Sequence, residues 1–512
     1  MNSLPLLSLI IFVPWAGALL LALLPKLPAG ASRALAVFFS LSTLALGTTV
    51  LSGFDPAAGL QCVEKHAWIS ALGVNYHLGA DGLSLVLVLL TGVIAPVALF
   101  GTVRAAKQPA LYAALFLFLQ GAALGVFLAL DFFPWFIFWE LSLVPAFFLI
   151  KLWGGGATES GQAAAARAAY QFVIYTIGGS AFMLMAFAAL FVATGTFDFV
   201  QLAALAQSGA LAAKLGAVGG FWPHLVFLGV FLGLAVKVPL FPFHTWLPPA
   251  YAEAPIGASM FLTGVMSKMG VYGFLRILWP IFPADLHAAA PCLIWLAVAG
   301  VVLGAYAAIK QTDLKRMVAY SSVNHLSYCL LALFAVALAG QPGEASASAL
   351  SGAILQMFNH GLSAAALFFC VGLLESRSNG LRGLNDFGGV RTAAPVFAAL
   401  CGISMFSSLG LPGLNGFVGE FLIFRGVFGL APATAAVSTL GLLATALFLL
   451  TFWQRVFHGP AKGAGVAFRD LDAGEIVTLL PLIALMFVLG LVPQLLAGLI
   501  NPLVTSWVSH LP

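Results

Sequence analysis

The stretch LVFLGVFLGLAVKVPLFPFHTWLPP at residues 225–249 combines the features that decide how this chain folds. It is apolar over the length of about 20 residues that a membrane-crossing helix needs, yet it contains Lys237, Pro239 and Pro242. A charge at bilayer depth costs about 2.5–3.5 kcal/mol, and proline interrupts the helical hydrogen bonds. Such a break is tolerated in a membrane only where it is packed in protein or lines water. The stretch therefore predicts a broken membrane helix built around a functional charge.

The rest of the chain also has the composition of a membrane protein. Of the 512 residues, 62% are hydrophobic and 7% are charged, whereas a soluble domain carries about 25% charged residues. Apolar runs separated by turn residues predict an all-α polytopic membrane protein with about fourteen transmembrane helices. The expected spans cover approximately residues 4–24, 33–52, 81–103, 110–130, 132–152, 168–194, 222–243, 254–279, 288–309, 316–338, 349–375, 393–428, 433–457 and 476–500.

The distribution of Lys and Arg predicts the orientation of these spans. An even number of crossings puts both termini on one side. Fifteen of the 21 Lys and Arg residues fall in the loops after odd-numbered spans, four, including Arg276 and Arg425, fall on the opposite side, and Lys237 and Lys268 lie inside spans. Because cytoplasmic loops are enriched in Lys and Arg, we expect both termini on the non-cytoplasmic side.

Other classes of protein find little support in the sequence. The net charge of +4 forms no basic cluster for nucleic acid. The five cysteines are scattered, with no zinc or iron–sulfur spacing and no disulfide framework. The nucleotide-binding glycine motifs are absent. We therefore expect no cofactor and no metal in this chain.

Several ionisable residues fall inside the apolar runs. They are Glu140, Lys237, Lys268 and Glu420, with His325 and His360 on polar helix faces nearby. Intramembrane ionisable residues are functional by default; burial disfavours a charged lysine and a nearby carboxylate favours it, so such a pair can load and release a proton. Three alternatives stay open: a structural ion pair, polar contacts that only hold helices together, and a pair of histidines that ligate haem.

Two spans carry breaks next to a buried charge, which suggests an internal repeat. The seventh contains Lys237 and the twelfth contains GLPGLNG, residues 410–416, before Glu420. Paired broken helices are typical of inverted-repeat transporters. We therefore expect an N-terminal three-helix segment (1–109), a first five-helix repeat made of spans 4–8 (110–279), a second, inverted one made of spans 9–13 (288–457), and a C-terminal helix (458–512).

At these residues the chain resembles the antiporter-like membrane subunits of proton-pumping NADH:quinone oxidoreductase, respiratory complex I, and most closely the M-type (chain 4) subunits. The resemblance also reaches Mrp-type antiporter subunits and covers nearly the whole chain. The motifs that carry it are DGLSLVLVLLT (81–91), FWELSLVPAFFLIKLWGG (138–155), KVPLFPFHTWLPPAYAEAP (237–255), SSVNHLSY (321–328), NHGLSAAALFF (359–369) and GLPGLNGFVGEF (410–421).

The resemblance implies a role for each buried residue. Glu140 and Lys237 would form the ion pair of the fifth and seventh helices, Lys268 would connect the two halves, and His325 and His360 would relay protons. Glu420 would hold the proton on the broken twelfth helix, where other subunit types typically carry Lys. The chain departs from the family at Pro249, Tyr251 and Arg425, which leaves the routes of proton entry and exit open.

We therefore expect a non-redox, proton-translocating membrane-arm subunit that is coupled to quinone reduction elsewhere in the complex. The resemblance implies L-, N- and K-type membrane neighbours, and flavin, iron–sulfur clusters, NADH and quinone in partner subunits. It also implies an integral protein of the bacterial inner membrane. The alternatives are a subunit of an Mrp-type sodium/proton antiporter, a ferredoxin- or hydrogenase-linked relative of complex I, and a haem-bearing quinol-oxidising cytochrome.

Overall fold

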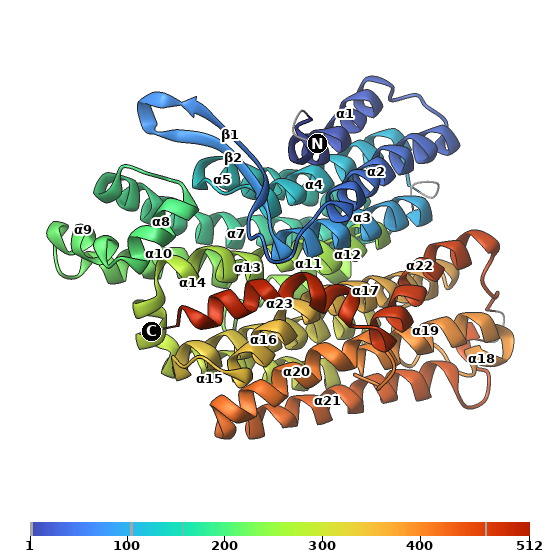
Figure 1. Cartoon of the computed structure of the whole chain (residues 1–512). Coiled ribbons are helices and arrows are strands. Elements are labelled where there is room, and N and C mark those ends of the chain that lie inside the picture. Colours follow the sequence, from blue (N-terminus) through green and yellow to red (C-terminus); the bar gives the residue numbers. More distant parts are fainter. Residues whose placement is uncertain (1–3, 103–105, 157, 466–467, 512) are drawn as a thin grey trace.

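Helices dominate the computed structural model of the chain, which describes residues 4–102, 106–156, 158–465 and 468–511 (Figure 1). Within these ranges, eleven helical segments are long and apolar enough to cross a membrane, or twelve if the bent pair of α9 (Ala210–Val218) and α10 (Trp222–Lys237) is one span. The eleven are α1 (Leu6–Leu23), α2 (Ala29–Ser52), α3 (Gly82–Thr102), α4 (Pro109–Leu128), α5 (Phe132–Leu141) with α6 (Leu143–Trp153), α7 (Glu159–Thr194), α15 (Pro283–Ile309), α16 (Leu314–Ala339), α17 (Glu344–Arg377), α21 (Pro432–Phe457) and α22 (Ala473–Leu491).

The remaining apolar runs are divided into shorter helices. The run that begins with α10 stops being helical after Lys237 and resumes as α11 (Leu247–Glu253). The twelfth run consists of α19 (Pro395–Ser408) and α20 (Asn415–Leu430). The eighth run is made of α12 (Ile256–Phe261), the π-helical segment η3 (Leu262–Met266), α13 (Lys268–Gly273), a second π-helical segment η4 (Phe274–Leu278) and α14 (Trp279–Ile281).

The structure contains a β-hairpin that the apolar pattern did not indicate. Strands β1 (Gln61–Ile69) and β2 (Val74–Ala80) pair antiparallel across the short helix η1 (Ser70–Leu72). Lys65 and His77 on the hairpin contact the carboxylate of Asp198, at 2.6 Å and 2.9 Å. The hairpin is thereby fastened to the N-terminus of α8 (Phe199–Gln207), where Asp198 also caps the helix by accepting from the backbone N–H groups of Val200 and Gln201.

The C-terminal segment is a second difference from expectation. A single span was predicted over 476–500, but α22 ends at Leu491 and α23 (Gln494–Ser509) starts after Pro493. The residue before a proline is pushed out of the helical region, and Val492 has φ −130° and ψ 64°. The C-terminal part is therefore two helices. Smaller elements complete the described chain: α18 (Val390–Ala393) and η5 (Gly463–Gly465).

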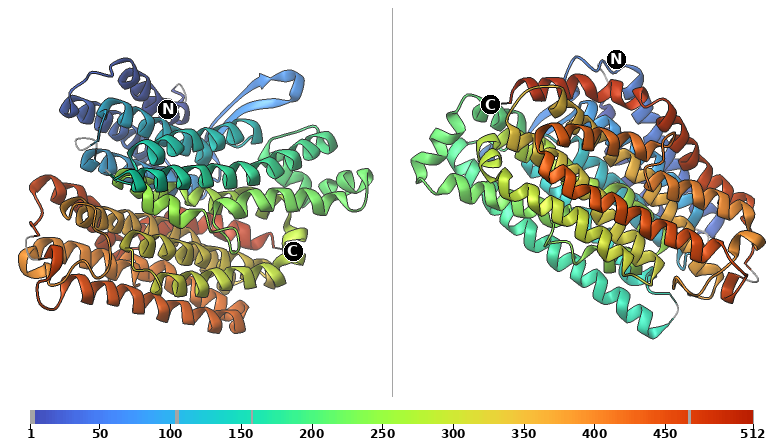
Figure 2. Two further views of the ribbon diagram at one scale, coloured as in Figure 1. Left: turned by 180° about the vertical axis from the view of Figure 1, so that it is seen from behind. Right: turned by 90° about the horizontal axis from the view of Figure 1, so that it is seen from below.

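The helices form two layers (Figures 1 and 2). The first half of the chain makes one layer, residues from about 280 to 460 make the other, and α23 runs across the front of the assembly in Figure 1. In the most apolar 18-residue stretch of α17 every residue is buried, and in that of α16 89% of the residues are buried. These two helices carry His360 and His325, so the polar residues of interest lie in the most enclosed part of the molecule.

Contacts between loops fall into two groups, at opposite ends of the helices. One group joins the start of α1 to the hairpin, the hairpin to Asp198, and Glu344 to Arg425. The other joins Arg377 to Glu475 and Arg382 to Glu253. These groups match the loops after even-numbered and odd-numbered predicted spans, respectively.

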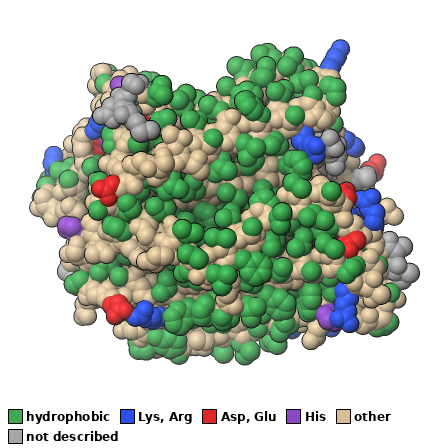
Figure 3. Space-filling view, turned by 45° about the vertical axis from the view of Figure 1, so that its right-hand side comes forward, with side chains coloured by type: hydrophobic (Ala, Val, Ile, Leu, Met, Phe, Trp, Pro, Cys, Tyr) green, Lys and Arg blue, Asp and Glu red, His purple; other side chains and the backbone are tan. Residues whose placement is uncertain are grey.

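The outer surface between these two ends is apolar. Figure 3 shows a face covered by hydrophobic side chains, with charged side chains gathered at two opposite edges. Large apolar residues of α7 and α21 point outward, among them Val192, which is 79% exposed, and Leu443. A surface of this kind suits contact with lipid.

Candidate functional site

The broken helix places Lys237 at a buried helix end. Helix α10 stops at Lys237, and the indole of Trp246 donates to the carbonyl of Val236 at 2.9 Å, which satisfies one acceptor at the break. Lys237 is 2% exposed, and its ammonium has no hydrogen-bond partner among the residues that the structure describes. It lies 4.9 Å from the centre of the Trp139 ring, a cation–π distance.

Glu140, at the end of α5, is close to Lys237 but does not make a direct ion pair with it. The carboxylate oxygen Oε1 of Glu140 is buried without a partner, as is the Lys237 ammonium. Their charges nevertheless act on each other. The pairing that the family resemblance implies is therefore not a direct contact in this structure, and the Lys237 ammonium lies over the Trp139 ring instead.

A small enclosed cavity adjoins Lys237. Its volume of about 10 Å³ is close to the smallest that holds one water molecule. Besides Lys237, its polar lining includes Tyr251 and Ser267. The apolar lining residues are Phe172, Trp246, Ala250, Leu262 and Met266. A water molecule here would lie between Lys237 and Ser267, the residue before Lys268.

Lys268 is fully buried and makes three hydrogen bonds. Its ammonium donates to the carbonyl of Thr263 at 2.7 Å, to Ser267 Oγ at 3.1 Å and to His360 Nδ1 at 2.7 Å. The π-helical segment η3 makes the first of these possible, because π geometry shifts which residue each carbonyl faces. Since Nδ1 of His360 accepts, a charged Lys268 fits a neutral His360 that carries its proton on Nε2.

The two predicted relay histidines lie against each other. The rings of His360 and His325 stack with centres 5.2 Å apart and planes 26° apart. His325 Nδ1 lies 2.7 Å from the carbonyl of Ser321, and Nε2 lies 3.0 Å from the carbonyl of Ser408. Carbonyl oxygens only accept hydrogen bonds, so both ring nitrogens donate, which fits the protonated imidazolium.

Glu420 ends this chain of contacts. Its Oε1 lies 3.3 Å from His325 Nε2 and accepts from the amide of Gln356 at 3.2 Å. The residue sits on α20 just after the break, and the other oxygen, Oε2, faces Gly410. A Cβ at Gly410 would lie 2.7 Å from that oxygen, and Gly410 has φ +78°. Glycine is needed there both for the backbone angle and for the approach of the carboxylate.

A pair of asparagines holds the break in place. Asn359 on α17 donates to the carbonyl of Asn415 at 2.7 Å, and Asn415 donates back to Asn359 Oδ1 at 3.2 Å. Ser407 at the end of α19 donates to Asn415 Oδ1 at 2.6 Å. The polar face of α17 therefore positions Glu420 as well as His360.

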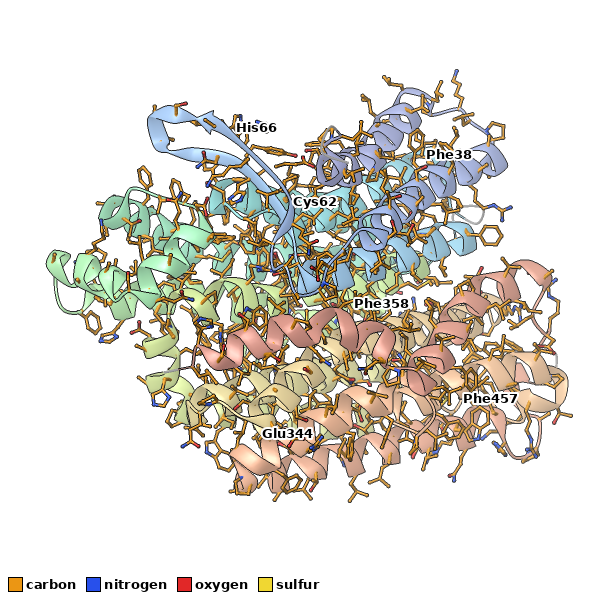
Figure 4. All side chains as sticks on the ribbon, in the orientation of Figure 1. Phe38, Cys62, His66, Glu344, Phe358 and Phe457 are labelled. Carbon is orange, nitrogen blue, oxygen red and sulfur yellow. The ribbon has the colours of Figure 1, made fainter. Side chains whose placement is uncertain are left out.

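This polar face lies deep in the molecule. Phe358, which directly precedes Asn359 and His360 on α17, lies between the two layers in the middle of the molecule (Figure 4).

The structure brings four of the six predicted residues into one continuous chain: Lys268, His360, His325 and Glu420. Lys237 lies on the far side of the one-water cavity, and Glu140 lies beyond Lys237. Tyr251, which the sequence marked only as a departure from the family, turns out to line that cavity, and its hydroxyl donates to the carbonyl of Leu262. Its role could not be read from residue type, because tyrosine is also common in apolar cores.

Arg276 lies near the end of the predicted span 254–279, on the side to which the tally of Lys and Arg assigns it. It belongs to η4, its side chain is 11% exposed, and it pairs with Asp81 at the start of α3. Tyr272 and Ser84 complete its contacts. The sequence does not show whether a charged residue near the end of an apolar run lies in a loop or in a buried ion pair.

The geometry of His325 and His360 does not fit the alternative in which they are the two axial ligands of a haem. Two axial histidines stand on opposite faces of a haem, but His325 and His360 stack directly on each other and contact Ser321, Ser408 and Lys268. In the part of the chain that the structure describes, no group of three or more His, Cys, Asp or Glu residues has the arrangement of a metal site.

Comparison with known proteins identifies the family. The family described as "NADH:quinone oxidoreductase/Mrp antiporter, TM" matches residues 129–447. Proteins named "NADH-quinone oxidoreductase subunit M" from Mycobacterium tuberculosis and Rhodobacter capsulatus are 36% and 35% identical, over 99% of this chain and 94% and 96% of their own lengths.

Solved structures agree. A chain of respiratory complex I from Thermus thermophilus is 28% identical and superposes with a TM-score of 0.85, over 99% of this chain and all of that one. A chain of the Mrp complex from a Dietzia species shares the fold, with a TM-score of 0.83, 21% identity and 99% coverage of both chains. The chain therefore belongs to the NADH:quinone oxidoreductase/Mrp antiporter transmembrane family, and within it to the subunit M group of NADH-quinone oxidoreductases.

Proposed function

We propose that this chain is a proton-translocating, non-redox membrane-arm subunit of an NADH:quinone oxidoreductase. Quinone reduction elsewhere in the complex would drive the protons, and the match to proteins named "NADH-quinone oxidoreductase subunit M" supports this coupling. The observation that carries the proposal is the buried chain of contacts from Lys268 through His360 and His325 to Glu420. A protein that needed only to span the membrane would have no use for so many desolvated ionisable groups.

The chain supports proton movement in steps. A proton on Lys268 passes to His360 along the 2.7 Å hydrogen bond and leaves the lysine neutral. Two charged rings with centres 5.2 Å apart repel by about 3 kcal/mol at an effective dielectric constant of about 20. His360 therefore accepts a proton readily only after His325 has given its own to Glu420. The two rings stack and no hydrogen bond between their described nitrogens joins them, so the transfer from His360 to His325 would need a bridging water or the turning of one ring. The repulsion then couples proton loading at Lys268 to proton release at Glu420.

The open Glu140–Lys237 pair would control when a proton is delivered to Lys268, at the end of the chain of contacts opposite Glu420. With Glu140 apart from it, Lys237 lacks a full counter-charge and holds its proton weakly. With Glu140 close, the lysine binds a proton again. The cavity beside Lys237 is large enough for one water, which could hand that proton towards Ser267 and Lys268.

We also propose the finer topology that the sequence predicts. Fourteen crossings would form two inverted five-helix units, 110–279 and 288–457, flanked by 1–109 and 458–512. The two groups of loop contacts support this order, because loops after odd-numbered spans contact one another and those after even-numbered spans do the same. The excess of Lys and Arg on the former supports a bacterial inner-membrane protein with both termini outside the cytoplasm.

The proposal assigns redox chemistry to partner subunits. NADH, flavin, iron–sulfur clusters and quinone would bind there and no cofactor would bind this chain, which would contact the L-, N- and K-type membrane subunits. The test is gentle purification of the chain from its native membrane, with mass spectrometry of its partners and an absorption spectrum. We expect iron–sulfur and flavin-bearing subunits. Small hydrophobic antiporter subunits without redox partners would contradict the proposal and favour the Mrp-type alternative.

A further inference from the structure

A cluster of five charged side chains lies at the end of the molecule that we propose to be cytoplasmic. Arg382, in the loop after α17, contacts Glu253 at 2.7 Å, Asp313 at 2.6 Å and Glu375 at 3.6 Å. Lys315 contacts Glu375 at 2.7 Å. The five residues come from α11, the first turn of α16, the end of α17 and the following loop, so the cluster joins the two layers of the fold.

The backbone fixes the cations of this cluster. The N–H of Leu314 donates to the carbonyl of Arg382 at 2.9 Å, and the N–H of Leu384 donates to that of Thr312 at 2.7 Å. These bonds strap the loop to the start of α16. Arg382 also donates to the carbonyl of Ala252 at 3.0 Å. The Arg382 guanidinium is therefore held in place between α11 and Asp313.

The charges of the cluster do not balance. Three carboxylates, those of Glu253, Asp313 and Glu375, face two cations, Lys315 and Arg382. One negative charge is therefore left over, unless a carboxylate holds a proton. Burial, with help from the neighbouring Glu253, raises the pKa of Asp313 although Arg382 and Lys315 oppose this. The group thus has more affinity for a proton than a carboxyl in water.

The cluster reaches from solvent into the interior. The side chains of Glu375 and Asp313 are 21% exposed, whereas those of Glu253 and Lys315 are at most 5% exposed. The outer pair therefore faces solvent, and Glu253 on the inner side shares Arg382 with it.

On the inner side of the cluster, hydrogen bonds to backbone carbonyls hold the segment that leads towards the relay, and these carbonyls accept hydrogen bonds without carrying the proton themselves. The Lys315 ammonium donates to the carbonyl of Ala254 at 3.2 Å, and Ser259 Oγ donates to the same carbonyl and to that of Tyr251. Tyr251 lines the cavity shared by Lys237 and Ser267. The inner end of the cluster therefore lies on the helix that closes this cavity.

We propose that the cluster of Glu253, Asp313, Lys315, Glu375 and Arg382 is the proton-loading site of the proposed translocation, which supplies protons to the buried lysines from the cytoplasmic side. The inference rests on the proposed function and adds the entry point to it. A hydronium ion gives its proton to an outer carboxylate and leaves as water. Burial, together with the neighbouring Glu253, raises the pKa of Asp313, so this carboxyl keeps a proton to a higher pH than a carboxyl in water.

The test is Glu375→Gln in inverted membrane vesicles, in which the cytoplasmic face is outside and its pH can be set. The readout is the initial rate of proton uptake divided by the rate of NADH oxidation, between about pH 6 and about pH 9. Removing one carboxylate leaves two carboxylates against two cations, so proton binding weakens. We expect the alkaline limb of the profile to move down by about one pH unit, with uptake within about twofold of normal at about pH 6.

Two further variants keep the test decisive. Asp313→Asn removes the same charge but retains a good helix-capping side chain, so it covers the case in which Glu375→Gln does not assemble, and the same shift is expected. Glu344→Gln is the control, since Glu344 lies at the other end of α17 in an exposed pair with Arg425 (Figure 4). That variant should leave the profile unchanged.

Three results would overturn the inference. Equal loss of uptake at every pH would make the cluster merely structural, an unchanged profile in both carboxylate variants would exclude it from proton entry, and the same shift in Glu344→Gln would make the effect unspecific. Vesicles of the unaltered protein that oxidise NADH without proton uptake would contradict the proposed function itself, which is a different result.

Discussion

Lys268 and His325 are both buried cation-forming residues, but their hydrogen bonds allow different chemistry. Lys268 donates to His360, which can take the proton. His325 donates to two backbone carbonyls that cannot, and only Glu420 beside it can accept a proton. Direction along the chain therefore follows from which neighbours are proton acceptors. The residue types were visible in the sequence, whereas these partners, which come from helices far apart in the chain, were not.

The role of Lys268 is tested by Lys268→Arg. A guanidinium keeps the positive charge but does not release its proton at any pH a protein experiences, so we expect normal assembly with proton uptake per NADH reduced by at least about tenfold. Lys310→Arg is the control, because Lys310 is exposed and its side chain, within the described part of the chain, contacts only the ring of Tyr306. Normal uptake with Lys268→Arg would show that Lys268 is structural.

The two breaks in the helices do more than interrupt apolar runs. The first leaves Lys237 at a helix end beside a cavity, and the second brings the Glu420 carboxylate against Gly410. Proline and glycine in the sequence predicted both breaks. They did not predict the two π-helical segments on either side of α13, because no residue type marks them.

The second break is tested by Gly410→Ala. The new Cβ would lie 2.7 Å from Glu420 Oε2 and would push the carboxylate away from His325. Gly413→Ala is the matched control, since Gly413 also has positive φ, +94°, but no atom lies within 4 Å of the Cβ position. Both variants pay about 1–2 kcal/mol of backbone strain, so we expect proton uptake to fall about tenfold further in Gly410→Ala. Equal activity would show that the Glu420 position does not matter.

The hairpin is tested by Asp198→Asn. Burial disfavours the charged form, but hydrogen bonds from His77 and Lys65 lower the pKa of Asp198 to about 2. A lowered carboxyl pKa stabilises the folded state above the unfolded value of about 3.9 and loses this effect as the pH falls towards 2. At neutral pH the contribution is therefore complete.

We expect Asp198→Asn to weaken the hairpin anchor by about 2 kcal/mol and to speed tryptic cleavage at Lys65. Asp55→Asn is the control, because the Asp55 carboxylate, among the described residues, accepts a hydrogen bond only from the backbone N–H of Ala57. Unchanged cleavage in Asp198→Asn would mean that the hairpin is held by other contacts.

In the whole molecule, two stacked layers of helices enclose the buried ionisable residues, and charged surface side chains gather at the two opposite ends of the helices. Much of this was predictable, because apolar runs, buried charges and the bias of Lys and Arg are properties of single segments. The rest depends on contacts between distant segments. Arg382 and Glu253 lie 129 residues apart in the chain, and each alone looks like an ordinary loop charge. The open Glu140–Lys237 pair and the contacts of the hairpin with Asp198 likewise depend on distant segments, whereas Pro493 marks the division of α22 from α23 in the sequence itself.

The central claim is that protons pass through this chain along its buried residues. The most direct measurement is proton uptake per NADH oxidised in inverted vesicles that carry Glu420→Ala or Lys237→Ala. Assembly is checked by the recovery of the complex. We expect intact complexes with uptake lowered in both variants, because Glu420 ends the chain of contacts that begins at Lys268, and Lys237 lies across the one-water cavity from that beginning. Full uptake in either variant would contradict the account.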